Sequence, residues 1–218
     1  MKKIQLLFAL AFAGISICNA QTSPSSATER ARKDSTARAK TISDSLRMEK
    51  LYASAQYPLI KGSKQSGVIP VSNPSEIPDP KREYKLLFKL WAKNPDSLSG
   101  EINQSIDEVV RILNLHVASG IPAGNLFPVI VIAGGGMEAL MTNDAYRKKH
   151  SADNPNLKVI SELEKIGTKL IVCGQSMAFK DFNKEDLLPE VKISLTAKTV
   201  LSNYQLQGYV LYSIEPDK

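Results

Sequence analysis

The residue in this sequence best suited to covalent chemistry is Cys173. It follows an apolar run over residues 170–172 that predicts a short strand. Gly174 then breaks the strand pattern, and Gln175 and Ser176 can open a helix. A thiol in this position lies at the carboxyl end of a strand, which is the edge where open α/β sheets bind ligands. The partial positive charge of a helix start favours thiolate over thiol.

The same position also suits an inert cysteine. Free cysteine is among the most buried residue types, so Cys173 could be a small hydrophobic residue that closes a strand. Reactivity requires both exposure and a lowered pKa. Both interpretations therefore stay open at the level of sequence.

A glycine run and a histidine are the other candidates. Gly134, Gly135 and Gly136 stand between a predicted strand and a short predicted helix, where backbone N–H groups could cradle an anion or simply form a tight turn. The run has neither the dinucleotide fingerprint nor the P-loop pattern. His116 lies beside the apolar face of a predicted helix, as a core histidine does; the functional alternative is a proton donor near Cys173.

The pattern of metal-ligating residue types predicts no metal site and implies no cofactor. The sequence contains two histidines, His116 and His150, and the second is expected in a polar loop. Neither Cys-x-x-Cys nor His-x-x-x-His spacing occurs. The nucleophile elbow Gly-x-Ser-x-Gly is also missing from the sequence, so a serine hydrolase has no support.

The first 20 residues have the pattern of a signal peptide. Lys2 and Lys3 precede an apolar run over residues 4–17, and Ala20 is a small residue at a suitable cleavage site. We therefore expect cleavage after Ala20 and a periplasmic or secreted chain. No apolar run is long enough to span a bilayer.

Loss of this leader changes the charge and the cysteine count. The formal charge falls from +6 to +4 (6 − 2), because Lys2 and Lys3 are removed without any acid. The remaining basic residues are scattered, so nucleic acid is not an expected partner. Cys18 is also removed, which leaves Cys173 without an internal disulfide partner.

The rest of the chain divides into an extension and a domain. Residues 21–50 are predicted to be a tether or a marginal charged helix, and prolines make residues 51–82 an extended segment. Strands are predicted at residues 84–91, 127–133, 170–173, 191–195 and 209–214, with helices at residues 103–119, 157–166 and 196–207. This alternation predicts one three-layer α/β domain over residues 83–216, with a central, mostly parallel five-stranded sheet and helices on both faces.

The domain resembles the exported, uncharacterised branch of the DsrE/DsrF-like family of sulfur-relay domains. The matching pieces are residues 113–122, 134–136, 154–156, 171–177, 186–192 and 206–209. The resemblance implies a small α/β fold that assembles into homo-oligomers, as a trimer or hexamer. It also implies a persulfide on Cys173 and a protein that donates or accepts sulfur.

Two functions of different classes fit these residues. One is a thiol-based sulfur carrier or redox protein that uses Cys173, with His116 relaying protons. The other is a non-catalytic module that binds a small ligand or anion and has an oligomeric structural role. Its binding residues would be Gly134, Gly135, Gly136, Gly174, Gln175 and Ser176.

Overall fold

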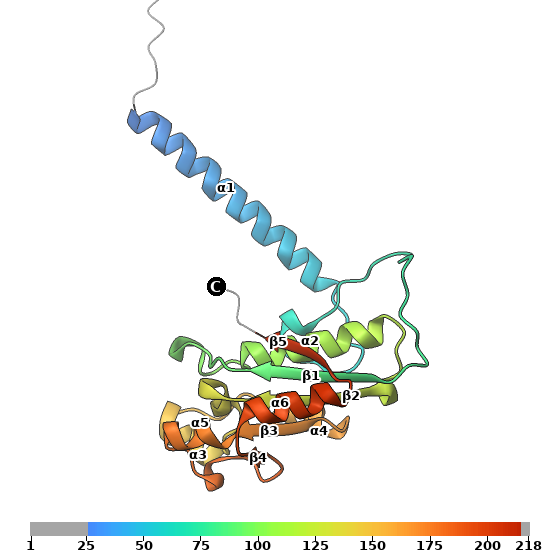
Figure 1. The fold of residues 1–218 in the computed structure, drawn as a ribbon. Helices are drawn as coiled ribbons and strands as arrows, with labels where there is room; N and C mark the ends of the chain where they lie inside the picture. The colour runs from blue at the N-terminus through green and yellow to red at the C-terminus, as the bar shows by residue number, and fades with distance from the viewer. Residues whose placement is uncertain (1–25, 215–218) are drawn as a thin grey trace, which may run out of the picture. The chain divides into compact units, whose positions relative to one another are not determined.

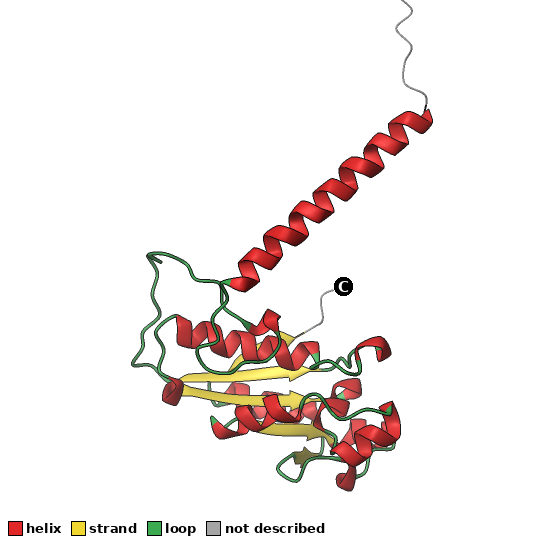
Figure 2. Cartoon of the chain, turned by 180° about the vertical axis from the view of Figure 1, so that it is seen from behind, coloured by secondary structure: helices red, strands yellow, loops and turns green. Residues whose placement is uncertain are grey.

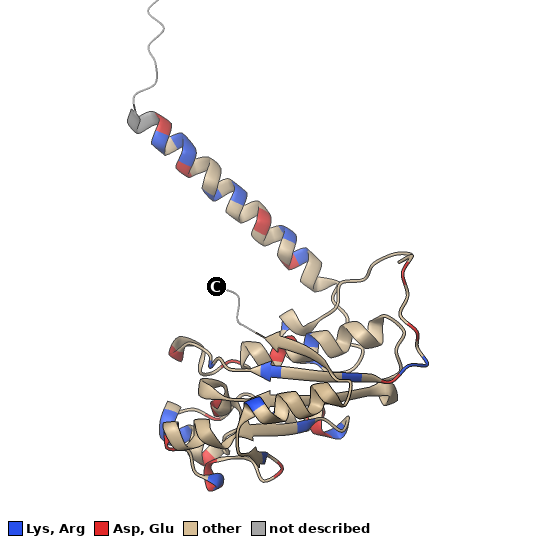
Figure 3. Ribbon diagram, in the orientation of Figure 1, with Lys and Arg blue, Asp and Glu red and all other residues tan. Residues whose placement is uncertain are grey.

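The computed structural model describes residues 26–214, and the predicted signal peptide, residues 1–20, lies outside them. The chain forms two compact units, one ending at Leu46 and the other beginning at Arg47. Helix α1 (Ser26–Ala53) crosses this boundary. Acidic and basic residues are interspersed along it (Figure 3), and all its residues from Glu29 to Lys50 are exposed. Most of α1 therefore contributes nothing to a core.

Deleting residues 21–46 is expected to change the free energy of unfolding of the second unit by less than about 1 kcal/mol, because the exposed side chains of α1 bury no surface. Thermal melting of the shortened and full chains would measure the change. A deletion that extends to Gly67 is the contrasting control, because it also removes the buried residues Ile60 and Ser66, which bond to Asn114, and should destabilise the unit strongly. Equal losses from the two deletions would contradict this assignment.

The second unit is built on a five-stranded sheet in which every pair of neighbouring strands is parallel (Figures 1 and 2). The strands are β1 (Tyr84–Leu90), β2 (Leu126–Ile132), β3 (Lys169–Cys173), β4 (Lys192–Ser194) and β5 (Val210–Ile214). Their order across the sheet is β4-β3-β2-β1-β5. The predicted fold class is confirmed.

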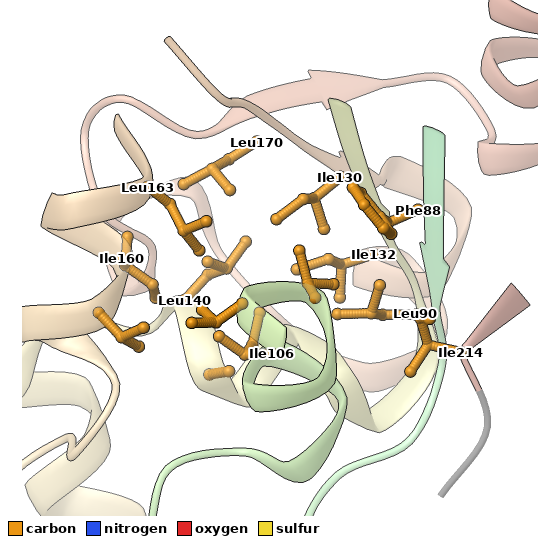
Figure 4. Close-up of a cluster of buried hydrophobic side chains, with 14 of the residues drawn as sticks. Phe88, Leu90, Ile106, Ile130, Ile132, Leu140, Ile160, Leu163, Leu170 and Ile214 are labelled. Atoms are coloured by element: carbon orange, nitrogen blue, oxygen red, sulfur yellow. The ribbon is translucent and has the colours of Figure 1, made fainter. Parts of the chain in front are cut away.

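Helices cover both faces of this sheet. Helices α2 (Gln104–Ala118) and α4 (Leu157–Lys165) bury apolar side chains in the larger core on one face (Figure 4). Helix α6 (Ala197–Leu206) packs on the other face. A parallel sheet covered on both faces needs apolar residues on both sides of its strands, which explains the continuous apolar run of β2.

The connections contain short helices, and four of them, at residues 64–66, 96–98, 123–125 and 143–150, were not predicted from the sequence. The short helices are η1 (Lys64–Ser66), η2 (Asp96–Leu98), η3 (Ala123–Asn125), η4 (Gly134–Leu140), α3 (Asn143–His150), α5 (Gly174–Lys180) and η5 (Lys184–Asp186). The prediction that His150 lies in a polar loop is wrong, because it is the last residue of α3. This helix is almost entirely polar and buries only Ala145 and Tyr146, so it shows little apolar periodicity.

The segment before β1 is held on α2 by two buried side chains. The Asn114 side chain donates to the carbonyl oxygens of Ile60 (2.8 Å) and Ser66 (2.9 Å). Its Oδ1 accepts from the N–H groups of Leu59 and Ile60, both at 3.0 Å. Asp107 Oδ1 accepts from the Ser63 N–H at 2.7 Å. Part of the region predicted to be an extended segment, residues 51–82, is therefore built into the second unit.

Candidate functional site

Cys173 is the last residue of β3 and lies opposite Ser194 of β4. Its side chain points to the face covered by α6 and is only 5% exposed. Its apolar neighbours in this second core cluster are Leu87, Val129, Val131, Ala133, Ile171 and Ala197. The thiol is thus buried at the carboxyl edge of the sheet.

Polar hydrogens surround the sulfur despite this burial. Burial by itself raises the pKa of the Cys173 thiol, but the backbone N–H of Ala197 lowers it. The N–H and the hydroxyl of Ser176, and the N–H of Gln175, lower it further. The net pKa of Cys173 lies below its ordinary value, so the site stabilises a thiolate.

Two helix starts converge on this one sulfur. Gln175 and Ser176 belong to the first turn of α5, as the sequence predicted. Ala197 is the first residue of α6, whose start is capped by the Thr196 hydroxyl accepting from the Lys198 N–H at 3.3 Å. We did not predict the second contribution from the sequence. The sequence contains a signal for it. Neighbouring parallel strands end at the same edge of a sheet, and Thr196 is a good N-cap residue, so a helix start near Cys173 could have been predicted.

Gly174 allows the two chain segments to approach each other. A Cβ at this position would lie 2.7 Å from the carbonyl oxygen of Ser194, closer than real Cβ atoms come to backbone. The adjacent Gln175 N–H donates to the carbonyl oxygen of Leu195 at 3.2 Å. The close contact therefore fixes the β4–α6 connection beside Cys173.

Replacing Gly174 with alanine is expected to push the β4–α6 connection away and withdraw the Ala197 N–H from the sulfur. The pKa of the Cys173 thiol should rise, because burial would remain while one stabilising N–H is lost. The pH dependence of alkylation measures this. Gly100→Ala is the matched control, since a Cβ there meets nothing within 4 Å. An unchanged pH profile in Gly174→Ala would count against the role assigned to Ala197.

The glycine run Gly134–Gly136 packs against the end of β1. Gly134 has φ +57°, and a Cβ there would lie 3.0 Å from the Trp91 carbonyl oxygen. The Gly136 N–H donates to the same oxygen at 3.2 Å. The run thus makes the tight turn and close packing that the sequence left as one of its two interpretations.

His116 is not brought to Cys173. It lies in the last turn of α2, where its Nδ1 contacts the Ile112 carbonyl oxygen at 2.7 Å. Its ring packs against Tyr84, the first residue of β1, with ring centroids 5.6 Å apart. Tyr84 packs in the cluster on the α2 face of the sheet, whereas Cys173 packs in the cluster on the α6 face. The two residues also lie at opposite ends of the parallel strands, because Tyr84 begins β1 and Cys173 ends β3. The proton relay is therefore not supported by the structure.

The described part of the chain has neither a cluster of metal-ligating side chains nor a helix that could cross a membrane. Among residues 26–214, no three His, Cys, Asp or Glu side chains are grouped so that they could hold a metal ion. No helix within this range has the length and apolar character needed to cross a bilayer.

Comparison with known proteins supports the resemblance given by the sequence. Residues 113–212 match the model of the DsrE/DsrF-like family. This matched region contains Cys173 and all of β3, β4 and α6. One similar solved structure is described as a protein of unknown function, MTH1491, from Methanobacterium thermoautotrophicum. It is 15% identical and covers 60% of this chain and 99% of its own, with a TM-score of 0.45. No curated protein matches the chain.

Proposed function

We propose, on the premise that residues 113–212 form a domain of the DsrE/DsrF-like family, that this chain is a sulfur carrier that uses Cys173. The family supports a sulfur-relay type of domain. The observation that supports the specific residue is the set of polar hydrogens from Gln175, Ser176 and Ala197 around a thiol of lowered pKa. The thiolate is the nucleophilic form of cysteine.

The proposed step is transfer of one sulfur atom. The Cys173 thiolate attacks the outer sulfur of a donor persulfide, and a new S–S bond forms on Cys173. The S–S bond of the donor breaks, and the donor leaves as a thiolate. The electrons balance without an oxidant, because one persulfide replaces another. The N–H groups at the starts of α5 and α6 favour the negative charge before and after the transfer.

A protein is a suitable donor or acceptor at this site. Exposed apolar side chains lie on the elements next to Cys173, with Phe179 at 88%, Leu195 at 76% and Ile193 at 45% exposure. The last two flank Gly174. Exposed apolar residues on neighbouring elements favour a protein contact. The leader pattern of residues 1–20 supports the further proposal that the carrier acts in the periplasm or outside the cell.

Intact mass after exposure to a persulfide donor tests the proposal. The full chain carrying Cys18→Ser has Cys173 as its single cysteine. We expect a mass gain of one sulfur atom that a reductant removes and that a small thiol acceptor takes over. The same chain with Cys173→Ser should gain nothing. A wild-type Cys173 that stays unmodified in the native state while reacting after unfolding would overturn the proposal.

The burial of Cys173 favours one alternative, a non-catalytic binding module. Cys173 as a residue is only 5% exposed, and reactivity of a thiol requires access. In that case the N–H and hydroxyl groups of Gln175, Ser176 and Ala197 would only provide hydrogen-bonding partners for a buried thiol. The mass experiment separates the two, because a binding module gives the negative result.

A further inference from the structure

The face of the sheet on which α6 packs is only partly covered. Leu211 of β5 pairs with Leu87 of β1, so both side chains point to this face. Leu87 is 0% exposed, whereas Leu211 is 38% exposed. Among the described residues, the core cluster on this face has no member from β5, and β5 lies clear of α6 in Figure 1. Because a parallel sheet normally has both faces covered, this part of the face is open to a partner.

Trp91 extends the open part of this face to the carboxyl edge, near Cys173. Trp91 follows β1, and the Ala133 N–H donates to the Leu90 carbonyl oxygen at 3.0 Å, so the two chain segments stay side by side just past the strand ends. Lys89 Nζ lies 4.7 Å from the centroid of the Trp91 ring, which places the ring on the same face as Lys89. Ala133 packs in the cluster of Cys173. One strand therefore separates Trp91 from Cys173, which is about 10 Å at the usual spacing of strands.

The charged residues of the strands and of α6 are all lysines. None of these six elements contains Asp, Glu or Arg, and Figure 3 shows blue but no red on them. Lys85 and Lys89 point to the α6 face, because side chains alternate along β1. Lys192 of β4 points to the same face, and Lys198 is exposed in the first turn of α6. Lysines that are scattered in the sequence thus gather on one face of the fold.

These four lysines are not neutralised by carboxylates of their own chain. Within residues 26–214, none of them forms an ion pair. The acids that immediately precede β1 and β4 in the sequence, Glu83 and Glu190, form no ion pair with them either. A surface that carries one sign of charge attracts a partner of the opposite sign.

We propose that the open strip formed by Lys85, Lys89, Trp91 and Leu211 binds the protein that exchanges sulfur with Cys173, and that this partner presents carboxylates around an apolar centre. The inference rests on the proposed function, whose partner it characterises. Trp91, 40% exposed, and Leu211 supply apolar contact area, and the two lysines lie beside them. An apolar centre with a polar rim is typical of protein interfaces, and tryptophan is enriched among the residues that contribute most binding energy.

The charge of the strip selects this occupant over two others. A second copy of the chain in a symmetric contact would bring Lys85 and Lys89 against the same lysines, and like charges that face each other oppose association. The phosphate backbone of a nucleic acid would match the lysines but would leave the exposed Leu211 without an apolar contact. A protein surface with glutamates or aspartates around apolar side chains matches both features.

Trp91 makes the test direct, because it is the single tryptophan in the sequence and its fluorescence reports on the strip. The full chain is titrated with the synthetic peptide Glu-Glu-Leu-Leu-Glu-Glu and with its analogue in which lysine replaces glutamate. We expect a saturable fluorescence change with the acidic peptide, weakened by added sodium chloride, and none with the lysine peptide. The peptides carry no persulfide, so this binding is independent of sulfur transfer. The intact-mass experiment with a persulfide donor tests the carrier separately, so failure of one proposal is distinguishable from failure of the other.

Charge-reversal variants assign the binding to the strip. Lys89→Glu and Lys85→Glu should each weaken the acidic peptide about fivefold or more, because an attraction becomes a repulsion. Lys158→Glu is the matched control and should have no effect, since Lys158 is exposed on α4, which packs on the other face. Equal affinity for the two peptides, or unchanged affinity in both strip variants, would overturn the proposal. It would also be overturned if Lys89→Glu changed the oligomeric state in light scattering, which would indicate a second copy, or if phosphatidylglycerol vesicles bound and the acidic peptide did not.

Discussion

Replacing Asn114 with leucine is expected to cost more than about 3 kcal/mol of the free energy of unfolding. The substitution removes four hydrogen bonds to the backbone of Leu59, Ile60 and Ser66. Ile60 and Ser66 are buried, so water does not replace the lost partners. Each buried polar group left unpaired costs about 1–3 kcal/mol. Leucine has a similar volume, so the loss reports hydrogen bonding rather than a cavity.

Denaturant unfolding of the full chain measures this loss. Asn203→Leu is the control, since Asn203 is exposed on α6 and the same change there should alter stability by about 0.5 kcal/mol or less. Limited proteolysis should also cleave residues 56–68 much faster in Asn114→Leu than in wild type, because that segment loses its attachment. Equal stability of the two variants would show that the segment is not part of the folded unit.

The second large effect expected is a dependence of stability on pH that comes from Cys173. Its pKa is lowered in the folded chain, while in the unfolded chain it returns to about 8.5. Between these two pKa values the unfolded state binds more protons, so the free energy of unfolding increases with pH by up to about 1.4 kcal/mol per unit. The contribution is complete above about pH 8.5 and is lost as the pH falls through the folded-state pKa.

Comparison of two chains isolates this contribution. With Cys18→Ser in both, the chain that retains Cys173 should gain stability across this window relative to Cys173→Ala, and other titrating groups cancel in the difference. Cys173→Ala also measures the packing of the sulfur in its buried cluster, as an offset that does not depend on pH. A difference that stays flat through the window would show that the folded chain does not lower the pKa of the thiol.

Much of the fold followed from the sequence because its longest elements have clear local patterns. The predicted strand at residues 127–133 is β2 (Leu126–Ile132), and the predicted helix at residues 103–119 is α2 with Asn103 as its N-cap. Strand β2 is a continuous apolar run, and α2 has a helical period of apolar residues and a clear capping residue. Helix α3 was missed because tertiary contacts of Tyr146, rather than its own pattern, hold it in place.

The candidate site was predictable only where it is local. The sequence placed Cys173 at a strand end before a helix start, because the relevant residues are adjacent. It did not reveal the donor from Ala197, which belongs to α6, beyond the following strand β4. The sequence also led us to include His116 as a proton donor near Cys173. No sequence pattern shows which end of the sheet a residue on a helix reaches, and His116 packs against Tyr84 at the other end.

The strand order has a consequence for how the molecule folds. Strand β1, the first to be synthesised, pairs on one side with β5, the last, as in the pair Leu86 and Val210. Pairing of such distant segments gives a high contact order and slow folding, because the chain entropy of closing that large loop is lost before the contact forms. A nascent chain therefore carries an open hydrogen-bonding edge on β1 until synthesis has passed Ile214. Truncation before β5 should leave that edge ready to pair with another chain.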